Sequence, residues 1–230
     1  NMESYFQSKL KLFTKLNKRN TAVINLDDPY AERILAETSA DIITYAMDKH
    51  ADLYPLKAEY KLNGIQAQLQ YGNMVISVNS NLVGEYNLYN IMAAIAVGLT
   101  MDIKPEIITE AMKQSLVIPG RLEIINANTP GKIFIDYAHT PDAYEKLFSA
   151  ISNLCSKEVA IFTVFGCGGD RDVKKRSEMA TIAEKYSDFV TVTTDNPRTE
   201  SLKTINSDIA SGFQGNNYEI ILDRKDAIYR

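Results

Sequence analysis

The sequence predicts an α/β protein whose second part is an open, Rossmann-type domain with a parallel sheet. From residue 132 onward, short apolar runs rich in β-branched residues alternate with helix-like segments, which is the pattern of such a domain. Before residue 80, apolar and polar residues alternate around Asn63-Gly64 and Gly72-Asn73, which are typical hairpin turn pairs. The first part is therefore expected to contain an antiparallel meander.

Residues 1–118 are predicted to form the first domain. An amphipathic helix is expected first, followed by a strand–helix–strand unit, the meander, an alanine-rich helix and a further helix that starts at a proline. The expected ranges are 2–17, Thr21 to Ala46, Tyr60 to Val78, Asn87 to Thr100, and Pro105 to about Leu116.

Residues 119–230 are predicted to form the second domain, with the boundary at Pro119-Gly120-Arg121. Strands are expected at 132–136, 159–164, 189–193 and 218–222, and helices at 140–154, 174–186 and 201–212. A chain of 230 residues suits one large or two modest domains. Because it starts and stops inside predicted helices, we expect it to be a piece of a longer protein.

Composition narrows the classes of protein. The net charge of −4 implies no general affinity for nucleic acid, and the basic residues between 9 and 19 are interpreted as a solvated helix face. Two cysteines suggest no disulfide framework and fit a reducing cytosol. The longest apolar run, Ile91 to Leu99, is shorter than the roughly 20 residues that a membrane-spanning helix needs. A cytoplasmic protein without membrane insertion is expected.

Lys9 falls on the apolar stripe of the first predicted helix, one turn from Tyr5 and one from Phe13. A lysine that points at a core is unexpected, because burial disfavours its charged form. One interpretation is a stem that packs while the ammonium group reaches water. The other is a neutral amine that is available for chemistry.

The segment Asp195-Asn196-Pro197-Arg198 lies between a predicted strand and a predicted helix, where open α/β sheets place their ligand sites. Asp195 can accept a hydrogen bond from an ammonium group, and Arg198 can hold a carboxylate with two parallel hydrogen bonds. Asn196 offers a donor and an acceptor, and Pro197 restricts the backbone. These residue types also occur in ordinary surface turns, which is the alternative interpretation.

Two further loops follow predicted strands of the second domain, at residues 136–142 and 165–172. If the loops meet at one sheet edge, Arg171 and Arg198 can face a single anion. The glycines are not a dinucleotide fingerprint, because arginine stands at 171 where a third glycine is required, and the chain has no Walker motif. With only His50 and His139 present, a zinc site built by this chain alone is not expected.

Asn87 and Asn90 lie three residues apart near the start of the alanine-rich helix and so share a face. Two side-chain amides in this arrangement match the hydrogen-bonding edge of adenine. Capping of the helix is the alternative role for both residues.

Taken together, several segments resemble the Mur ligases of peptidoglycan synthesis, and they occur in the same order over nearly the whole chain. The segments are 5–13, 84–94, 120–123, 136–142, 165–172 and 195–200. The resemblance implies the carboxyl-terminal half of a central ATPase domain at 1–118 and a Rossmann-like domain at 119–230. It implies an ATP-dependent amide ligase that acts through an acyl phosphate, with Mg²⁺ as cofactor.

The resemblance also implies roles for single residues. Lys9 is the family's carbamylated lysine, whose carbamate holds magnesium. Asn87 and Asn90 lie near adenine, and Arg121, Asp136 and His139 bind the nucleotide. Arg171, Asn196 and Arg198 bind the incoming amino acid, and the run from Asp195 through Pro197 to Arg198 matches the family's meso-diaminopimelate motif. The implied partners are ATP, meso-diaminopimelate and the UDP-N-acetylmuramoyl dipeptide, and a monomer is expected.

The family has parts that these 230 residues lack: a UDP-binding domain, a phosphate-binding loop, further metal-binding residues upstream of Lys9, and a segment that completes the amino-acid pocket. The isolated chain is therefore expected to be inactive. The alternatives are a non-catalytic amino-acid-binding module, and another Mur or folylpolyglutamate-type ligase. Arg198 discriminates among the ligases, because lysine-adding relatives usually lack the arginine.

Overall fold

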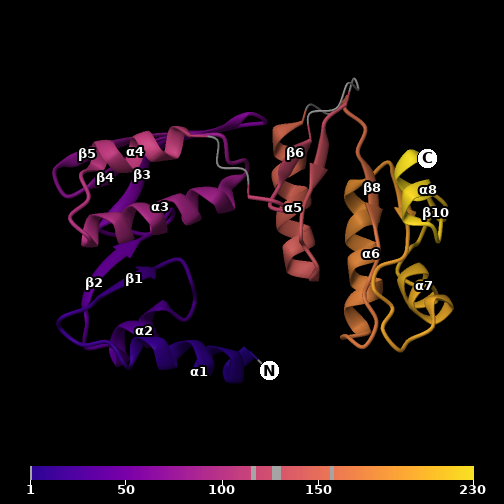
Figure 1. The fold of residues 1–230 in the computed structure, drawn as a ribbon, viewed down its shortest axis with the longest axis horizontal. Helices are drawn as coiled ribbons and strands as arrows, with labels where there is room; N and C mark the ends of the chain where they lie inside the picture. The colour runs from indigo at the N-terminus through magenta and orange to yellow at the C-terminus, as the bar shows by residue number, and fades with distance from the viewer. Residues whose placement is uncertain (1, 115–117, 126–130, 156–157) are drawn as a thin grey trace. The chain divides into compact units, whose positions relative to one another are not determined.

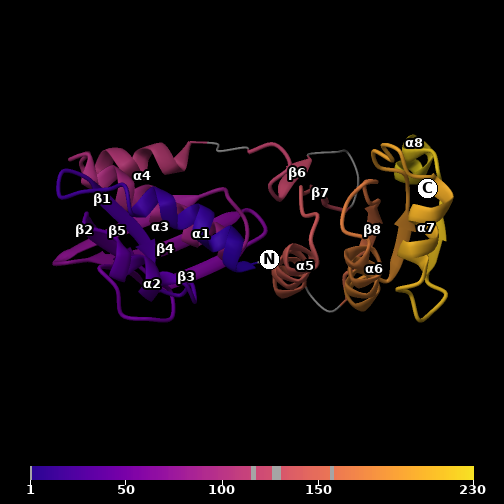
Figure 2. The same cartoon turned by 90° about the horizontal axis from the view of Figure 1, so that it is seen from below.

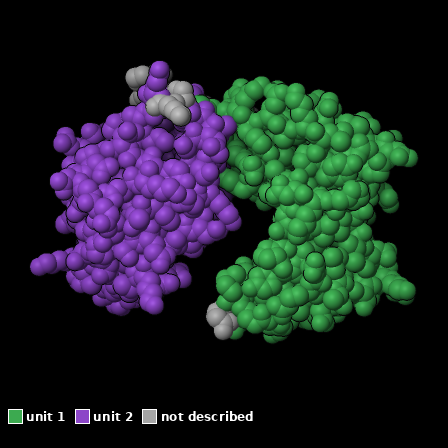
Figure 3. All heavy atoms as spheres, turned by 180° about the vertical axis from the view of Figure 1, so that it is seen from behind, with its two compact units in different colours: residues 1–118 green, residues 119–230 purple. Residues whose placement is uncertain are grey.

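The computed structural model describes residues 2–114, 118–125, 131–155 and 158–230. The chain divides into two compact units, Asn1–Ile118 and Pro119–Arg230 (Figure 3). Both units combine helices with a sheet, which confirms the predicted α/β class. The predicted end of a helix near Leu116 falls outside the described residues.

Unit 1 is built on a five-stranded sheet in the order β1-β2-β3-β4-β5 (Figure 1). The strands are β1 (Thr21–Asn25), β2 (Asp41–Tyr45), β3 (Leu53–Lys61), β4 (Gly64–Tyr71) and β5 (Met74–Ser80). The first three run parallel, and β3, β4 and β5 form the predicted antiparallel meander. Gly64 has φ +140°, and an added Cβ there would collide with the carbonyl oxygen of Ser80, so this turn requires glycine.

Helices cover both faces of strand β1. Ala22 and Ile24 pack with α1 (Met2–Phe13) and α2 (Ala31–Glu37), whereas the intervening Val23 packs on the opposite side. That side carries α3 (Glu85–Thr100), whose Leu88 and Ile91 lie in the main core of the unit. Helix α4 (Pro105–Lys113) contacts β5 and α3. The carboxyl end of β1 is thereby fixed against the amino-terminal half of α3.

Unit 2 contains a parallel sheet in the order β10-β9-β8. Its elements are α5 (Pro141–Leu154), β8 (Phe162–Phe165), α6 (Lys174–Tyr186), β9 (Phe189–Val192), α7 (Leu202–Ala210), β10 (Tyr218–Ile220) and α8 (Arg224–Tyr229). Figure 2 labels strand β8 of this sheet and the helices α6 and α7. Residues from α5, α6 and α7 share one hydrophobic core with β8 and β9. The expected parallel sheet is therefore present in this part of the unit.

The first predicted strand of unit 2 does not join that sheet. Strand β7 (Ile133–Ile135) pairs antiparallel with β6 (Glu123–Ile125), a strand that the sequence pattern did not predict. Both strands are only three residues long, and they are close in sequence, so local pairing satisfies their backbone groups. The prediction of one parallel sheet is wrong for this strand.

Other expectations meet mixed outcomes. Helix α1 ends at Phe13, before the predicted residue 17, while α6 spans the predicted residues 174–186. Cys155 and Cys167 are both free thiols, as the cysteine count predicted. Burial raises the pKa of the Cys167 thiol to about 11, so this cysteine is a packing residue in the core of unit 2. Across the described residues, every helix is too short or too polar to cross a bilayer.

Candidate functional site

The loops that follow β8 and β9 lie against each other. We call residues 166–172 the glycine loop and residues 194–200 the recognition loop. The Gly169 amide donates a 2.9 Å hydrogen bond to the carbonyl oxygen of Asn196, and a Cβ added at Gly169 would collide with the carbonyl oxygen of Pro197. Glycine is needed here because the two backbones approach so closely. The parallel pairing of β8 with β9 brings both loops to one sheet edge.

Side chains join the two loops at three further points. The Asp170 carboxylate accepts hydrogen bonds from the Thr199 amide at 3.2 Å and from the Thr199 hydroxyl at 2.8 Å. In return, the Asp170 amide donates to the carboxylate of Glu200. Asp170 and Arg198 have φ values of +52° and +51°, a left-handed conformation that costs non-glycine residues roughly 1–2 kcal/mol each. The cross-links hold the backbone in this unfavourable conformation.

A buried arginine lies beneath both loops. Arg176 of α6 has a side chain that is 0% exposed, and its guanidinium donates two 2.8 Å hydrogen bonds to the carboxylate of Glu200. It also donates at 2.8 Å to Asp208 of α7 and at 3.3 Å to the carbonyl oxygen of Gly168. The hydrogen bond from Arg176 holds the pKa of Glu200 below its ordinary value of 4.5. One cation therefore ties the glycine loop, the recognition loop and α7 together.

The two predicted anion-binding arginines are exposed on these loops. Within the described part of the chain, the Arg171 side chain makes no hydrogen bond or ion pair. The Arg198 guanidinium has one long contact, 3.5 Å from the carbonyl oxygen of Asp170. The Asn196 side-chain oxygen accepts a 3.2 Å hydrogen bond from the Arg198 amide. This bond closes a local turn that runs from Asn196 through Pro197 to Arg198. Both guanidiniums are thus accessible to a carboxylate from solvent.

Asp195 already has a partner. Its carboxylate lies 3.1 Å from the guanidinium of Arg224, which also donates to the carbonyl oxygen of Thr194 at 2.7 Å. The sequence alone predicted Asp195 as an acceptor for an ammonium group. An arriving ammonium group would therefore have to share this carboxylate with Arg224.

The loop after β7 is organised by Asp136. One carboxylate oxygen accepts from the Leu122 amide and the other from the Ala138 amide, both at 2.7 Å. Leu122 is buried and has φ +46°, so Asp136 stabilises an unfavourable backbone conformation directly after Arg121. Asp136 thereby acts on Arg121 through the backbone.

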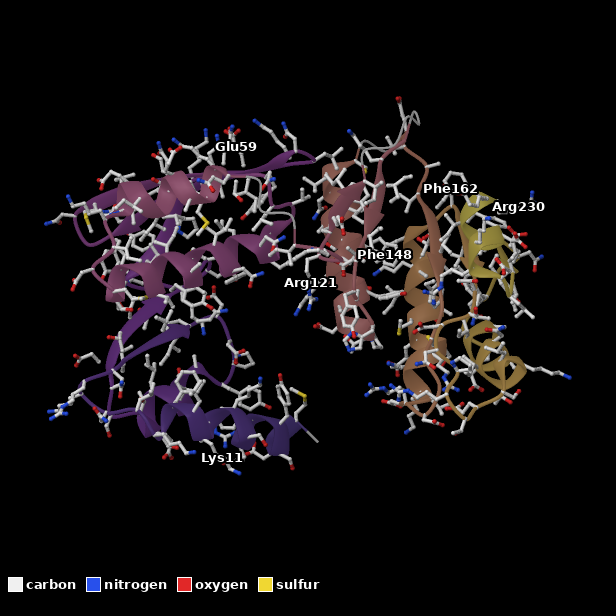
Figure 4. The ribbon with its side chains drawn as sticks, in the orientation of Figure 1. Lys11, Glu59, Arg121, Phe148, Phe162 and Arg230 are labelled. Atoms are coloured by element: carbon white, nitrogen blue, oxygen red, sulfur yellow. The ribbon has the colours of Figure 1, made fainter. Side chains whose placement is uncertain are left out.

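Arg121 and His139 both lie next to the ring of Tyr137. The Arg121 guanidinium carbon is 5.6 Å from the centre of the Tyr137 ring, and the His139 ring is 5.2 Å from it (Figure 4 labels Arg121). All three side chains are exposed. Lys175 of α6 donates to the carbonyl oxygen of His139 at 3.1 Å, which ties this loop to the helix that carries Arg176. The structure therefore brings Arg121, Asp136 and His139 into one loop cluster of unit 2.

The two asparagines of α3 bind each other. Asn87 is buried and donates at 2.7 Å to the carbonyl oxygen of Val83, and its oxygen accepts from Asn90 at 3.1 Å. Neither residue is the amino-terminal cap, which is Gly84. The amide of Asn87 is committed to local hydrogen bonds, whereas Asn90 is exposed.

Lys9 does not lie on the buried face of α1, where the sequence pattern places it. The buried residues of α1 are Phe6 and Leu10, while Lys9 and Tyr5 are exposed. Phe13 of the predicted stripe is partly buried, whereas Tyr5 and Lys9 lie outside the buried face, and the ammonium group lies 5.3 Å from the centre of the Tyr5 ring. Neither a packed stem nor a buried amine is present at this position, because the side chain lies on the exposed face of α1. Among the described residues, no group of three or more histidine, cysteine or acidic side chains lies close enough together to hold a metal ion.

Several residues of the site were not predicted from the sequence, namely Arg176, Glu200, Asp208, Arg224 and Tyr89. Arg176 shares a stripe of α6 with Met179, Ala180 and Ala183, all of them buried. A cation at helical spacing with apolar residues was a detectable feature. The spacing that singles out Lys9 on α1 therefore singles out Arg176 on α6 as well. On α3, the Tyr89 hydroxyl donates to Asp27 at 3.0 Å and links the helix to the end of β1.

Known proteins resemble this chain throughout. A 2,6-diaminopimelate-adding UDP-N-acetylmuramoyl-L-alanyl-D-glutamate ligase of Syntrophomonas wolfei is 39% identical over 99% of this chain and 47% of its own length. The protein of the same name from Fusobacterium nucleatum is 40% identical over 99% of this chain and 46% of its own length. The chain thus spans about half the length of the curated relatives it matches.

Solved structures give the same picture of the fold. The structure of a UDP-N-acetylmuramoyl-L-alanyl-D-glutamate--2,6-diaminopimelate ligase matches 99% of this chain at a TM-score of 0.63 and 32% identity, and the match covers 48% of that chain. MurF from Acinetobacter baumannii matches all of this chain and 48% of its own at a TM-score of 0.78, but its 16% identity supports the fold alone. Residues 1–98 match the Mur ligase middle domain, and residues 120–230 match the Mur ligase glutamate ligase domain. The chain therefore belongs to the Mur ligase family.

Proposed function

We propose that this chain is the middle and glutamate ligase part of an enzyme that adds meso-diaminopimelate to UDP-N-acetylmuramoyl-L-alanyl-D-glutamate at the expense of ATP. The observation that carries the proposal is Arg198. It stands exposed in the recognition loop, beside a glycine loop that presents a second free cation, Arg171. Relatives at 36–41% identity bear the name of this ligase, which supports the same substrate.

The reaction divides into two steps. The carboxylate of the dipeptide substrate attacks the γ-phosphorus of ATP, which forms an acyl phosphate and releases ADP. The amine of the incoming amino acid then attacks the acyl carbon and displaces phosphate, and the amine loses a proton. The second step requires that the amino acid be held with its amine directed at the acyl group, which is the work of a binding pocket.

The residues of unit 2 supply that binding. Diaminopimelate differs from lysine by a second carboxylate, for which the planar guanidinium of Arg198 is a two-pronged donor. Arg171 and the amide of Asn196 contribute further donors. Asp195, shared with Arg224, lowers the local positive charge and favours a zwitterion over a simple anion. Pro197 restricts the backbone between Asn196 and Arg198, so less entropy is lost on binding.

We propose five residues as nucleotide-binding residues. Unit 2 contributes Arg121, Asp136 and His139, and unit 1 contributes Asn87 and Asn90. Arg121 and His139 present exposed nitrogen atoms next to the Tyr137 ring. Asp136 fixes the backbone next to each of them, through the amides of Leu122 and Ala138. Asn90 offers the accessible amide, while Asn87 orients it through their mutual hydrogen bond. Lengthening of that bond in a nucleotide complex is expected if Asn90 turns toward a base.

For Lys9, we propose carbamylation followed by Mg²⁺ binding through the carbamate. The exposed amine is open to CO₂, and a carbamate is an oxygen ligand of the type that Mg²⁺ prefers. Magnesium would supply charge neutralisation at the phosphates. The measurement is a carbon NMR spectrum in labelled bicarbonate, compared with Lys9→Ala. A carbamate resonance that persists in Lys9→Ala would remove Lys9 as its site.

The substrate assignment is tested by calorimetric titration of the protein with meso-diaminopimelate, with L-lysine as the control ligand. A hydrogen bond to a charged group is worth ~1.5–3 kcal/mol, so the loss of two, ~3–6 kcal/mol, predicts a complex that is weaker by ~10²-fold or more in Arg198→Ala. Lysine is expected to bind weakly, and equally so in both proteins. Equal binding of the two ligands would remove Arg198 as the selector and favour a lysine-adding ligase or a non-catalytic amino-acid-binding module.

A further inference from the structure

We propose that Arg176, Glu200 and Asp208 form an ionic clamp whose Arg176–Glu200 half positions the two amino-acid-binding loops. The clamp does not touch a ligand. It acts through the glycine loop and the recognition loop, which carry Arg171 and Arg198. The positional part of the inference stands on the structure alone, and only its consequence for diaminopimelate rests on the proposed function.

Arg176 and Glu200 together contact both loops. Glu200 is the last residue of the recognition loop, and its carboxylate accepts both from Arg176 and from the Asp170 amide of the glycine loop. Arg176 in turn donates to the carbonyl oxygen of Gly168. The pair therefore contacts both loops at once, from below, with a cation that is 0% exposed.

Each of the two loops contains a residue with a strained backbone. Asp170 and Arg198 occupy the left-handed region, with φ values of +52° and +51°, and neither is glycine. Such conformations persist only where the surroundings over-determine them. Here Asp170 is held on its amide side by Glu200 and on its carboxylate side by Thr199, the residue after Arg198. Release of Glu200 removes one of these two restraints on Asp170 and leaves the hydrogen bonds between its carboxylate and Thr199 as the other.

The two carboxylates of the clamp differ in what they contact besides Arg176. Asp208 also accepts a 2.8 Å hydrogen bond from Arg176, but it lies on α7, and among the described residues its carboxylate bonds to Arg176 and to neither loop. Glu200 and Asp208 thus share the buried cation, while only Glu200 reaches the loops. Removal of either carboxylate takes a negative partner away from Arg176, so Asp208 is a matched control for Glu200.

The experiment compares Glu200→Ala with Asp208→Ala by amide hydrogen exchange, with the Thr199 and Gly169 amides as reporters. Neither amide is bonded to Glu200: Thr199 donates to Asp170, and Gly169 donates to Asn196. We expect exchange at both reporters to accelerate by about tenfold or more in Glu200→Ala and by much less in Asp208→Ala. Equal acceleration in the two variants, or none in Glu200→Ala, would overturn the positioning role.

Two further variants guard against a trivial loss of folding. Glu200→Gln keeps an oxygen for the Asp170 amide but removes the charge, and Arg176→Lys keeps the charge but not the two-pronged geometry. Intermediate acceleration of the reporters is expected in both, at a temperature where circular dichroism shows folded protein. Wild-type exchange rates in both variants would contradict the clamp even if Glu200→Ala does not fold.

The ligand arm then separates the clamp from the substrate assignment. If the proposed function holds, the dissociation constant for meso-diaminopimelate rises about tenfold in Glu200→Ala, because binding must first reorder the loops, and less than about threefold in Asp208→Ala. If the wild-type protein does not bind diaminopimelate, the proposed function fails, and the exchange measurements still decide on the clamp. If it binds and both variants bind equally well, the positional effect on recognition is excluded.

Discussion

Helices α1 and α6 each carry a cation at helical spacing with apolar residues, and the two cations end in opposite environments. Lys9 of α1 is exposed, with its ammonium group over the ring of Tyr5. Arg176 of α6 is 0% exposed and meets two carboxylates. Spacing along a helix is therefore insufficient to say which cation is buried.

What separates the two positions is the supply of carboxylates from neighbouring elements. Glu200 and Asp208 come from the recognition loop and α7, and they compensate the desolvation of the Arg176 guanidinium. In the part of unit 1 that the structure describes, no acidic side chain is bonded to Lys9. A buried cation positions the groups around it, whereas an exposed one remains open to chemistry.

The largest expected effect is the loss of the buried cation. Arg176→Met leaves Glu200 and Asp208 without their shared partner, and breaking a buried pair in this way typically costs ~3–5 kcal/mol. We expect the free energy of unfolding of unit 2 to fall by about that amount in urea titrations, because both carboxylates remain partly buried.

Lys9→Met is the matched control, since it removes a cation of the same charge from a helix. An exposed substitution of this kind is expected to change stability by less than about 0.5 kcal/mol. Equal losses in the two variants would contradict the difference between the helices, and so would an Arg176→Met protein as stable as the wild type.

The next effect concerns acid pH. The hydrogen bond from Arg176 lowers the pKa of Glu200 below 4.5, so the stabilisation by this pair is complete above pH 4.5 and is lost as the pH falls through the lowered folded-state value. Glu200→Gln cannot titrate there. Thermal melts between pH 6 and pH 3 are expected to show a smaller acid-induced decrease for this variant than for the wild type. A parallel decrease in both proteins would mean that Glu200 is not an acid-sensitive link.

The sequence predicted the loops better than the clamp beneath them. The motif Asp195 to Arg198 and the glycine loop are contiguous, and each follows a strand, so their meeting at one edge follows from parallel pairing. The clamp joins Arg176 to residues 24 and 32 positions later in the chain, at Glu200 and Asp208. No local pattern specifies such a pairing.

Two errors have related causes. Tyr5 and Lys9 were placed on the buried face of α1 because Tyr5, Lys9 and Phe13 fit helical spacing as well as Phe6, Leu10 and Phe13 do, and only packing against α2 decides between them. Strand β6 was missed because three residues are too few to show a period, and its pairing with β7 changed the expected sheet.

Unit 1 has its own, weaker anchor between Tyr89 and Asp27. Partial burial alone would raise the pKa of Asp27, but hydrogen bonds from the Met47 and Asp48 amides and from the Tyr89 hydroxyl outweigh it, and the pKa lies below 3.8. Tyr89→Phe removes one of these donors and is expected to cost about 1 kcal/mol.

Because the folded-state pKa of Asp27 is lowered, the stabilisation that Tyr89 provides is present above pH 3.8 and is lost at more acid pH. The difference in unfolding free energy between Tyr89→Phe and the wild type is therefore expected to shrink as the pH falls below 3.8. Urea titrations at pH 7 and pH 3 measure it. A difference that grows in acid would show that Tyr89 does not act through the ionised carboxylate.

The smallest expected effect has the opposite sign. Arg198→Gly removes a side chain that makes one long contact, and it relieves a left-handed backbone at φ +51°. The relief of ~1–2 kcal/mol is offset by the extra freedom that glycine gives the unfolded chain, roughly 0.5–1 kcal/mol, so unit 2 should be stabilised by ~0–1.5 kcal/mol. Arg198→Ala keeps the left-handed strain and is the control. If thermal melts show the glycine variant to be clearly less stable than the alanine variant, the backbone at 198 is not strained. Suppose instead that the glycine variant proves the more stable of the two while neither variant binds meso-diaminopimelate. In that case the strained backbone at Arg198 serves recognition and not folding, whereas Arg176 contributes to folding.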